Sequence, residues 1–397
     1  MKKNIPTSKT TEWLLTRKCN MNCKYCFEKD KSVGTLNLDE FYNFLFKDNY
    51  AIPTGNFYMF GGEPMLELDL IIELIERIKA DDTLCSDMKE EWIQSITKNL
   101  TTNGTLVAKN IDKLKKYNFS LQISLDGPKE INDEMRIDHA GNGKFEEIQK
   151  GIELLIENNI PFTLHGAVSG ERFKYFDKIT IWYIKEFIKR TPEINPNRLC
   201  SMLNNNYCQL LFEDDYTDEQ IDELLTSYYN IVEYLLTSDD FKDFSIDERK
   251  LVVCGFLTRK GAICAAGNSM FAIDNNEFIY PCHRWMTSGL DKNHNLSFDG
   301  LKETRLGGTN YKCYEQLLDL PRSKIMYGMM YDNNIKSQSN FQFQANWCPA
   351  TNLEVTGNAQ VLPPKYTVMI AELQNFIPKL AEYFKIDIFD YMKNHKR

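Results

Sequence analysis

Strand-like and helix-like segments alternate along the first 240 residues, and this alternation most constrains the fold of the chain. The clearest strand covers residues 119–126, where apolar and polar residues alternate with period two. A helix at 71–78 is indicated by isoleucine and leucine residues that recur at i, i+3, i+4 and i+7. The same reasoning gives strands at 12–16, 57–60, 94–100, 119–126, 162–168 and 199–203, and helices at 38–46, 71–78, 106–117, 148–155, 179–189 and 218–236. About six successive strand–helix units predict an α/β fold, a partial (β/α)6 TIM-like barrel with right-handed crossovers.

Polar side chains share one face of two expected strands. They include Ser124 and Asp126 on one strand and Thr163 and His165 on the other. A filled barrel normally carries branched apolar side chains inside, so polar ones predict a wet lumen that holds a ligand. The alternative is a strand that is simply half exposed. His165 is a candidate for substrate binding or proton removal, although a lone lumen histidine is as often a structural hydrogen-bond partner.

Three cysteines, Cys19, Cys23 and Cys26, follow the first expected strand with the spacing C-x3-C-x2-C. Thiolates on one tight loop can each bind one iron of a cubane cluster, and a ferredoxin-type run would need a fourth cysteine. A site with three cysteines leaves one iron open to a chelating ligand. The alternatives are a zinc site that uses Cys23 and Cys26, and a thioredoxin-like C-x-x-C motif.

Composition narrows the class of protein further. The chain has 397 residues and 11 cysteines, and in a reducing compartment so many cysteines favour metal or redox chemistry over disulfides. Its net charge of −9 disfavours a nucleic-acid partner. No apolar segment follows Met1 and no run reaches the roughly 18 apolar residues of a membrane span, so we expect a cytoplasmic protein without membrane contact.

The cysteine loop resembles the signature of the radical S-adenosylmethionine (radical SAM) enzymes, including the aromatic Tyr25 before the last cysteine. The resemblance implies a [4Fe-4S] cluster whose open iron is chelated by S-adenosylmethionine. One electron from the reduced cluster then cleaves the sulfonium to methionine and a deoxyadenosyl radical, which abstracts hydrogen from a C–H bond. In such enzymes the cofactors carry the hard chemistry and the protein supplies positioning.

Three further segments resemble the same family and fall at ends of expected strands: FGGEP at 60–64, TTNGT at 101–105 and SLDGPKEINDEMR at 124–136. In the family the first segment holds the methionine amino group, while Ser124 would contact the ribose and Arg136 the carboxylate. An arginine suits a carboxylate because its donors form a planar fork. The bland alternatives are Gly-Gly and Asn-Gly turns. The cofactor contacts implied by the resemblance are Tyr25, Gly61, Gly62, Glu63, Pro64, Asn103, Ser124, Asp126 and Arg136.

The pattern changes after residue 236, and we expect domains at 1–240 and 254–362 followed by a helical segment at 363–397. Residues 264–282 resemble the start of the SPASM or twitch domain, which carries auxiliary iron–sulfur clusters. Glu277 stands where the family usually has glycine, and the later cysteine series of a full SPASM domain is missing. Five cysteines can ligate one auxiliary [4Fe-4S] cluster but not two. The expected ligands are Cys264, Cys282 and Cys348, with Cys254 or Cys313 as the fourth; the alternative is scattered buried cysteines.

The resemblance implies an enzyme that modifies a peptide or small protein by crosslinking, epimerisation or oxidation, as maturases of ribosomally made peptides do. Its electron donor would be a flavodoxin or ferredoxin. Because the first strand begins about ten residues after Met1, we expect no leader-binding winged helix at that end. The alternatives are a radical SAM dehydrogenase of a small molecule and a non-catalytic protein, either an iron–sulfur electron carrier or a zinc-stabilised binding protein.

Overall fold

The structure is a computed structural model. It describes residues 10–26, 28, 31, 37–46, 57–168, 170–191, 193–204, 208–210, 216–258, 270–273, 278–280, 282, 307–308 and 364–394. The chain divides into two compact units. The first unit comprises Met1–Ser124, Met135–Leu164 and Ala265–Asp332, and the second comprises Leu125–Glu134, His165–Cys264 and Asn333–Arg397.

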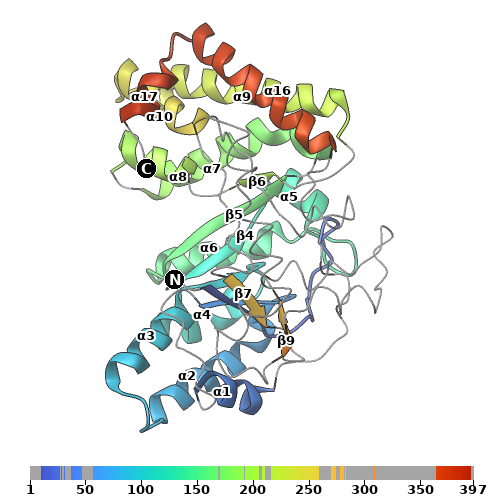
Figure 1. Ribbon diagram of the computed structural model, residues 1–397, viewed down its shortest axis with the longest axis vertical. Coiled ribbons are helices and arrows are strands. Elements are labelled where there is room, and N and C mark those ends of the chain that lie inside the picture. Colours follow the sequence, from blue (N-terminus) through green and yellow to red (C-terminus); the bar gives the residue numbers. More distant parts are fainter. Residues whose placement is uncertain are drawn as a thin grey trace, which may run out of the picture. The chain divides into compact units, whose positions relative to one another are not determined.

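The first unit contains a sheet in which β4, β7 and β9 are labelled in Figure 1. Its strand order is β4-β3-β2-β1-β7-β8-β9. Neighbouring strands from β4 to β7 run parallel, and β8 and β9 add antiparallel pairs at the other end. The strands are β1 (Thr10–Leu14), β2 (Phe57–Phe60), β3 (Leu100–Thr102), β4 (Leu121–Ser124), β7 (Met270–Ile273), β8 (Phe278–Tyr280) and β9 (Gly307–Gly308). The carboxyl ends of the parallel strands β1 to β4 therefore lie at one edge of this sheet.

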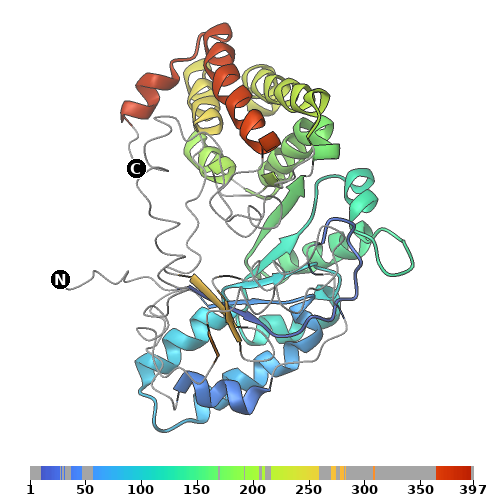
Figure 2. The ribbon, with the colours of Figure 1, turned by 45° about the vertical axis from the view of Figure 1, so that its right-hand side comes forward.

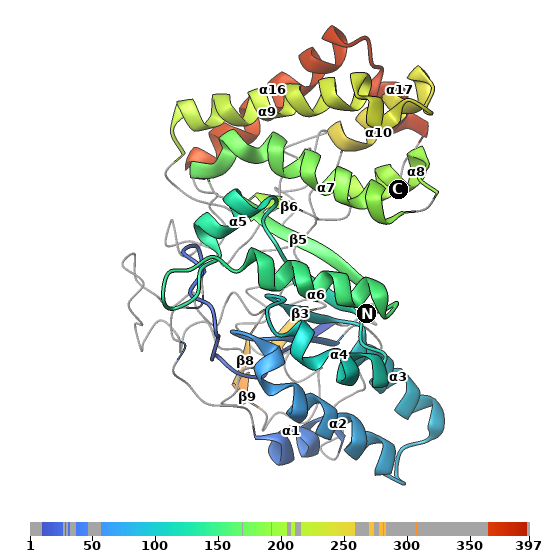
Figure 3. The ribbon, with the colours of Figure 1, turned by 180° about the vertical axis from the view of Figure 1, so that it is seen from behind.

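Helices of the first unit bury one apolar stripe each. In α2 all four residues of the i, i+3, i+4, i+7 pattern are inaccessible to solvent, as amphipathic spacing requires. Trp13 of β1 stacks on Phe41 with ring centroids 3.9 Å apart, so the sheet and α1 share one core. Figure 3 shows α2, α4 and α6 in front of the strands. The helices are α1 (Leu38–Phe46), the 3-10 helix η1 (Pro64–Glu67), α2 (Leu68–Ala80), α3 (Ser86–Thr97), α4 (Val107–Lys116) and α6 (Phe145–Glu157).

The second unit is mainly helical. The carboxyl half of β5 (Phe162–Val168) pairs in parallel with β6 (Cys208–Leu210). Capping boxes at Thr217 and Ser245 begin α9 and α10, and α16 packs beside α9 (Figure 2). The helices are α5 (Lys129–Met135), the 3-10 helix η2 (Gly170–Tyr175), α7 (Phe176–Arg190), α8 (Pro196–Asn204), α9 (Asp218–Thr237), the 3-10 helix η3 (Asp239–Phe241), α10 (Ile246–Leu257), α16 (Pro364–Tyr383) and α17 (Ile388–Asn394).

The expected α/β fold with parallel strands is confirmed. Strands 57–60 and 162–168 and helix 38–46 have the predicted bounds. Two predicted strands are wrong: residues 94–97 end α3, with the strand at Leu100–Thr102, and residues 199–203 lie in α8, with the strand at Cys208–Leu210. Leu199 and Leu203 are both fully buried, which is the i, i+4 spacing of one helix face. A short apolar run does not distinguish a buried strand from a helix, and that ambiguity caused the second error.

The alternating pattern of β4 is also confirmed, because Leu121 and Ile123 are buried while Gln122 and Ser124 are half-buried. The expected domain limits stay predictions, since most of residues 259–363 lie outside the described residues. Within the part of the chain that the structure describes, no helix has both the length and the apolar character needed to cross a bilayer.

Candidate functional site

The cysteine loop leaves β1 and makes a tight turn between its second and third cysteines. The amide of Cys26 donates to the carbonyl of Cys23 over 3.1 Å, and the amide of Met21 donates to Sγ of Cys19 over 3.4 Å. All three cysteines are half-buried, and none forms a disulfide with another described cysteine. Burial raises the pKa of the Cys19 thiol to about 11, so a metal that binds there must displace its proton.

A buried ion pair joins the two ends of this loop. Nη1 of Arg17 lies 2.7 Å from Oε2 of Glu28, and the side chains are only 10% and 6% exposed. The ammonium of Lys31 also donates to the carbonyl of Met21, over 2.7 Å. The ion pair therefore joins the residue two positions before Cys19 to the residue two positions after Cys26. This pair could not be predicted from the sequence, because a long-range ion pair leaves no periodic pattern.

The segment 135–143 runs along the cysteine loop and supports it from outside. The amide of Lys24 donates to the carbonyl of Met135 over 3.0 Å, and that of Asn22 donates to Ile137 over 2.7 Å. Nε2 of His139 lies 2.9 Å from the carbonyl oxygen of Cys19. This segment was not anticipated from the sequence beyond the single residue Arg136.

Two residues expected to contact the cofactor lie against each other at this place. The guanidinium of Arg136 sits over the ring of Tyr25, 5.5 Å from its centroid. Such a cation–π contact orients the planar fork of the guanidinium as well as the ring. The structure therefore brings Arg136, from the end of the fourth strand–helix unit, to the turn between Cys23 and Cys26.

The FGGEP segment packs against the same loop through its backbone. The amide of Gly62 donates to the carbonyl of Thr16 and the amide of Glu63 donates to that of Lys18, each over 2.8 Å. A Cβ atom built on Gly62 would lie 2.3 Å from the oxygen of Lys18, and one on Gly61 would lie 2.4 Å from that of Thr16. Both glycines are thus required by close approach to the cysteine loop.

Glu63 is a structural carboxylate at the end of β2. It is fully buried, with one oxygen accepting from the hydroxyl of Thr102 and the amide of Met65 and the other from the amide of Asn103, over 2.7, 3.0 and 2.7 Å. Burial raises the pKa of its carboxyl, while these three donors act in the opposite direction. Pro64 is also buried and begins η1. Glu63 therefore joins the carboxyl ends of β2 and β3.

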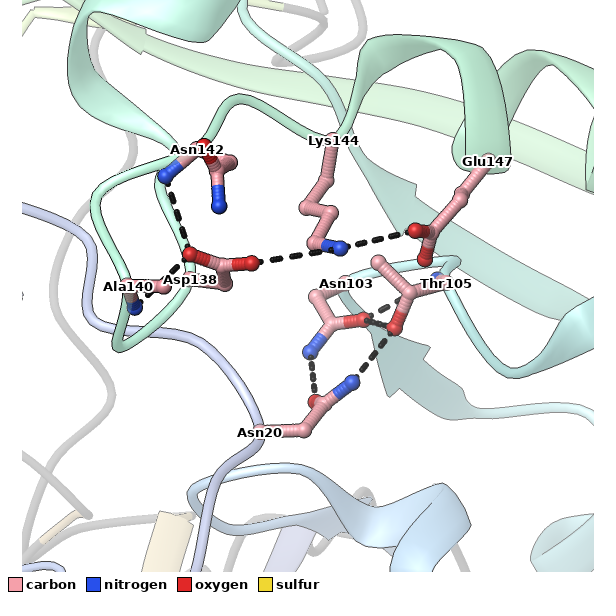
Figure 4. Close-up of polar contacts among 8 residues, drawn as sticks. All are labelled: Asn20, Asn103, Thr105, Asp138, Ala140, Asn142, Lys144 and Glu147. Atoms are coloured by element: carbon pink, nitrogen blue, oxygen red, sulfur yellow. Dashed lines mark hydrogen bonds and ion pairs between the residues drawn. The ribbon is translucent and has the colours of Figure 1, made fainter.

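Three polar side chains connect the cysteine loop to the turn after β3. Asn20, Asn103 and Thr105 form a closed set of hydrogen bonds, which Figure 4 shows beside a second cluster around Asp138 and Lys144. Nδ2 of Asn103 also lies 3.9 Å from Sγ of Cys19. Asn103, which the sequence selects as a cofactor contact, is 7% exposed and lies within this set.

Ser124 is half-buried at the end of β4 in the first unit, whereas Asp126 and His165 belong to the second unit. Asp126 is fully buried: it accepts from the amide of Ala167 over 3.1 Å and pairs with Nη1 of Arg172 at 3.4 Å. His165 is half-buried and its carbonyl accepts from the amide of Leu125 over 2.9 Å. Arg172, which is 1% exposed, was missed by sequence reasoning.

Among the cysteines expected to bind an auxiliary cluster, Cys264, Cys313 and Cys348 lie outside the described residues. Cys282 is described and buried. Cys254 lies on α10 in the core of the second unit, with Sγ 4.0 Å from the carbonyl oxygen of Asp387. Burial raises the pKa of its thiol to about 12, and the neighbouring Cys200 thiol adds to this effect.

The residues of the cysteine loop fit a cubane cluster. Among the described residues, no three His, Cys, Asp or Glu side chains converge as ligands of a single metal ion. A cubane does not need such convergence, because each thiolate binds its own iron. Three half-buried thiols on one loop, with amide donors aimed at the sulfur of Cys19, are the donor set that this group uses.

Comparison with known proteins agrees with this site. Residues 13–180 match the model of the Radical SAM superfamily. The radical SAM cyclopropyl synthase TigE of Paramaledivibacter caminithermalis is 22% identical over 69% of this chain, which spans 57% of that relative's length. The cysteine-type anaerobic sulfatase-maturating enzyme of Clostridium novyi is 23% identical over 83% of both proteins.

A solved structure, native anSMEcpe with bound AdoMet, has a similar fold: its TM-score is 0.63 at 16% identity, covering 94% of this chain and 98% of that one. At this identity the likeness concerns the fold, and it agrees with the partial barrel expected from the sequence. The matched residues 13–180 contain the three cysteines and the FGGEP, TTNGT and SLDGP segments. Residues 13–180 are therefore a radical SAM domain.

Proposed function

We propose that the chain is a radical SAM enzyme that cleaves S-adenosylmethionine reductively and uses the deoxyadenosyl radical to modify a peptide or protein. The observation that carries the proposal is the cysteine loop itself. Its three thiols stand directly after β1, and the glycines of the segment after β2 approach its backbone closely. The iron–sulfur cluster would supply the one-electron reduction, and hydrogen abstraction from the substrate would follow.

The protein's own residues would bind and orient the cofactor. Cys19, Cys23 and Cys26 would each hold one iron. Arg136, oriented by Tyr25, offers a planar fork to a carboxylate. The half-buried Gly61 and Gly62 would contact the methionine portion, and the half-buried Ser124 would contact the ribose. Glu63 would act indirectly, because its oxygens already accept hydrogen bonds from protein donors.

A peptide or protein substrate is supported by the relatives. One is named a sulfatase-maturating enzyme, and a solved neighbour with a TM-score of 0.62 holds the Cp18Cys peptide. Reducing equivalents would come from a flavodoxin or ferredoxin. We further propose one auxiliary cluster with Cys264, Cys282 and Cys348 as ligands. The burial of Cys254 against α17 and Cys200 favours Cys313 as the fourth ligand.

The test is anaerobic reconstitution followed by reduction with dithionite in the presence of S-adenosylmethionine. We expect about eight irons per chain and formation of deoxyadenosine. Cys23→Ala should abolish deoxyadenosine, whereas Cys85→Ala, at an exposed cysteine outside the loop, should not. An iron-free parent chain, or unchanged deoxyadenosine formation in Cys23→Ala, would contradict the proposal. About four irons would remove only the auxiliary cluster.

The peptide part has its own test. Deuterated peptides that carry a cysteine, serine or threonine should transfer deuterium to deoxyadenosine, and a panel of deuterated small alcohols should not. Transfer from the alcohols alone would favour the dehydrogenase alternative.

A further inference from the structure

We propose that Asn103 is a positioning residue that raises the reduction potential of the cluster held by Cys19, Cys23 and Cys26, and that it is not a contact of S-adenosylmethionine. This inference rests on the proposed function, since it concerns the same cluster. Asn103 lies in the turn after β3 and is 84 positions from Cys19 in the sequence.

The side chain of Asn103 is held in a ring of three hydrogen bonds, drawn in Figure 4. Nδ2 of Asn20 donates to Oγ1 of Thr105 over 2.8 Å, and that hydroxyl donates to Oδ1 of Asn103 over 2.7 Å. Nδ2 of Asn103 closes the ring by donating to Oδ1 of Asn20 over 2.8 Å. Each side chain both donates and accepts, so the ring fixes the Asn103 amide.

The orientation of the Asn103 amide follows from a backbone group. The amide N–H of Thr105, which can only donate, lies 3.0 Å from Oδ1 of Asn103. The atom facing that N–H must be the oxygen, because a flipped amide would place two donors against each other. Nδ2 therefore points to the cysteine loop.

This arrangement uses all the hydrogen-bonding capacity of the Asn103 amide. Its oxygen accepts from the hydroxyl and the amide of Thr105. Of the two hydrogens on Nδ2, one goes to Asn20 and the other faces Sγ of Cys19 at 3.9 Å. A carboxamide has two acceptor positions and two donor hydrogens, so none is left for a nucleoside.

The consequence for the cluster is electrostatic. Cys19 receives a backbone donor from Met21 at 3.4 Å as well as the side-chain donor of Asn103. Hydrogen bonds to the sulfurs are among the factors that set the potential of an iron–sulfur cluster. A donor stabilises the additional negative charge of the reduced state, so its loss should make reduction harder. The main chain of Asn103 is fixed separately by its bond to Glu63, so the donor is held on the first unit's sheet.

The experiment is a redox titration of the reconstituted full-length chain, followed by electron paramagnetic resonance. The signal that changes on addition of S-adenosylmethionine identifies the relevant cluster. At a fixed potential, Asn103→Ala should lower the ratio of reduced to oxidised cluster about threefold, the effect of losing one weak hydrogen bond. Its dissociation constant for S-adenosylmethionine should match that of the parent.

Thr101→Val is the matched control, because Thr101 lies on β3 just before Asn103 and its hydroxyl donates to Gln122 of β4 over 3.2 Å instead of facing Cys19. At the same fixed potential, the ratio of reduced to oxidised cluster in Thr101→Val should equal that of the parent. If Asn103→Ala does not retain iron, the isosteric Asn103→Asp takes its place: it keeps the acceptor for Thr105 and replaces the donor with a charged oxygen. Loss of the donor and gain of the charge both oppose reduction, so the ratio of reduced to oxidised cluster should fall by more than about threefold.

An unchanged ratio in the variant that retains iron overturns the inference. Weaker binding of S-adenosylmethionine at an unchanged ratio would make Asn103 a cofactor contact and also overturn it. Failure of the proposed function would be recognised differently, because the parent chain itself would then lack cluster iron or form no deoxyadenosine.

Discussion

The close approach of Gly62 to the cysteine loop makes Gly62→Ala the most informative single change. An added Cβ would lie 2.3 Å from the oxygen of Lys18 and 2.4 Å from that of Arg17. Real Cβ atoms essentially never approach another heavy atom within 3.0 Å, so the backbone at Gly62 and the cysteine loop must move apart by roughly 1 Å. The contacted atoms belong to the backbone, so no side-chain rotation can relieve the overlap.

The expected cost follows from the contacts that separation disturbs. Overpacking in a close-packed region costs about 1–3 kcal/mol. Separation also stretches two hydrogen bonds, from Gly62 to Thr16 and from Glu63 to Lys18, which contribute about 1 kcal/mol each. The free energy of unfolding should therefore fall by about 3–5 kcal/mol. Because the displaced residues directly precede Cys19 in the cysteine loop, iron bound per chain should fall as well.

Urea unfolding of the apoprotein and iron content after reconstitution measure the two effects. Gly141→Ala is the control, since a Cβ there meets nothing within 4 Å and bears only the cost of a positive φ of 86°, about 1–2 kcal/mol. Gly141→Ala should keep its iron. The close approach would be refuted if Gly62→Ala had a free energy of unfolding within about 0.5 kcal/mol of the parent's and bound the same amount of iron per chain.

Three more predictions concern buried groups. Arg17→Met leaves the carboxylate of Glu28 buried without this guanidinium and should lower the free energy of unfolding by about 3 kcal/mol, measured in urea; the double variant with Glu28→Leu should recover most of that loss. Glu63→Gln turns an amide donor toward the N–H of Asn103 or of Met65 and should cost about 2 kcal/mol in the same assay. The Cys254 thiol, whose pKa burial raises to about 12, should react with iodoacetamide far more slowly than the exposed Cys85, at a rate that rises tenfold per pH unit between pH 7 and about 9. Because the native chain keeps that proton where the unfolded chain has lost it, stability should fall as pH rises above about 8.5. Equal rates for the two thiols by mass spectrometry would contradict the burial of Cys254.

The fold was predictable where a local pattern carried the information. Residues 119–126 alternate with period two, and this pattern correctly predicted a strand, although β4 covers only Leu121–Ser124. The helical spacing of the apolar residues of α2 was also interpreted correctly. Residues 94–97 and 199–203 were misread because each is a short segment without a decisive period. Trp92 and Ile96, both buried, show the helical spacing only when the preceding turn is included.

The site was predictable in its chemistry and much less in its support. The spacing of the three cysteines predicted the cluster site, and the position of the FGGEP, TTNGT and SLDGP segments at the ends of expected strands predicted that they lie beside it. Arg17 and Glu28 carry no such mark, since each is an ordinary charged residue until folding buries the pair. Arg172 likewise looks like a surface residue in a polar stretch, although its guanidinium binds the buried Asp126 and the carbonyl of Ile131.

The contacts of the cysteine loop explain why distant residues should affect its metal chemistry. Fixing the backbone of one residue costs about 1–2 kcal/mol, so a loop that binds a cluster benefits from being ordered beforehand. The ordering contacts come from far along the chain: Gly62 from the end of β2, Asn103 from the end of β3 and His139 from the segment after α5. Two of these, Asn103 and His139, reach Cys19, one at its sulfur and one at its carbonyl. Substitutions at Asn103 or His139 should therefore alter iron binding at Cys19 more than at Cys23 and Cys26. The turn between Cys23 and Cys26 closes through its own backbone hydrogen bond.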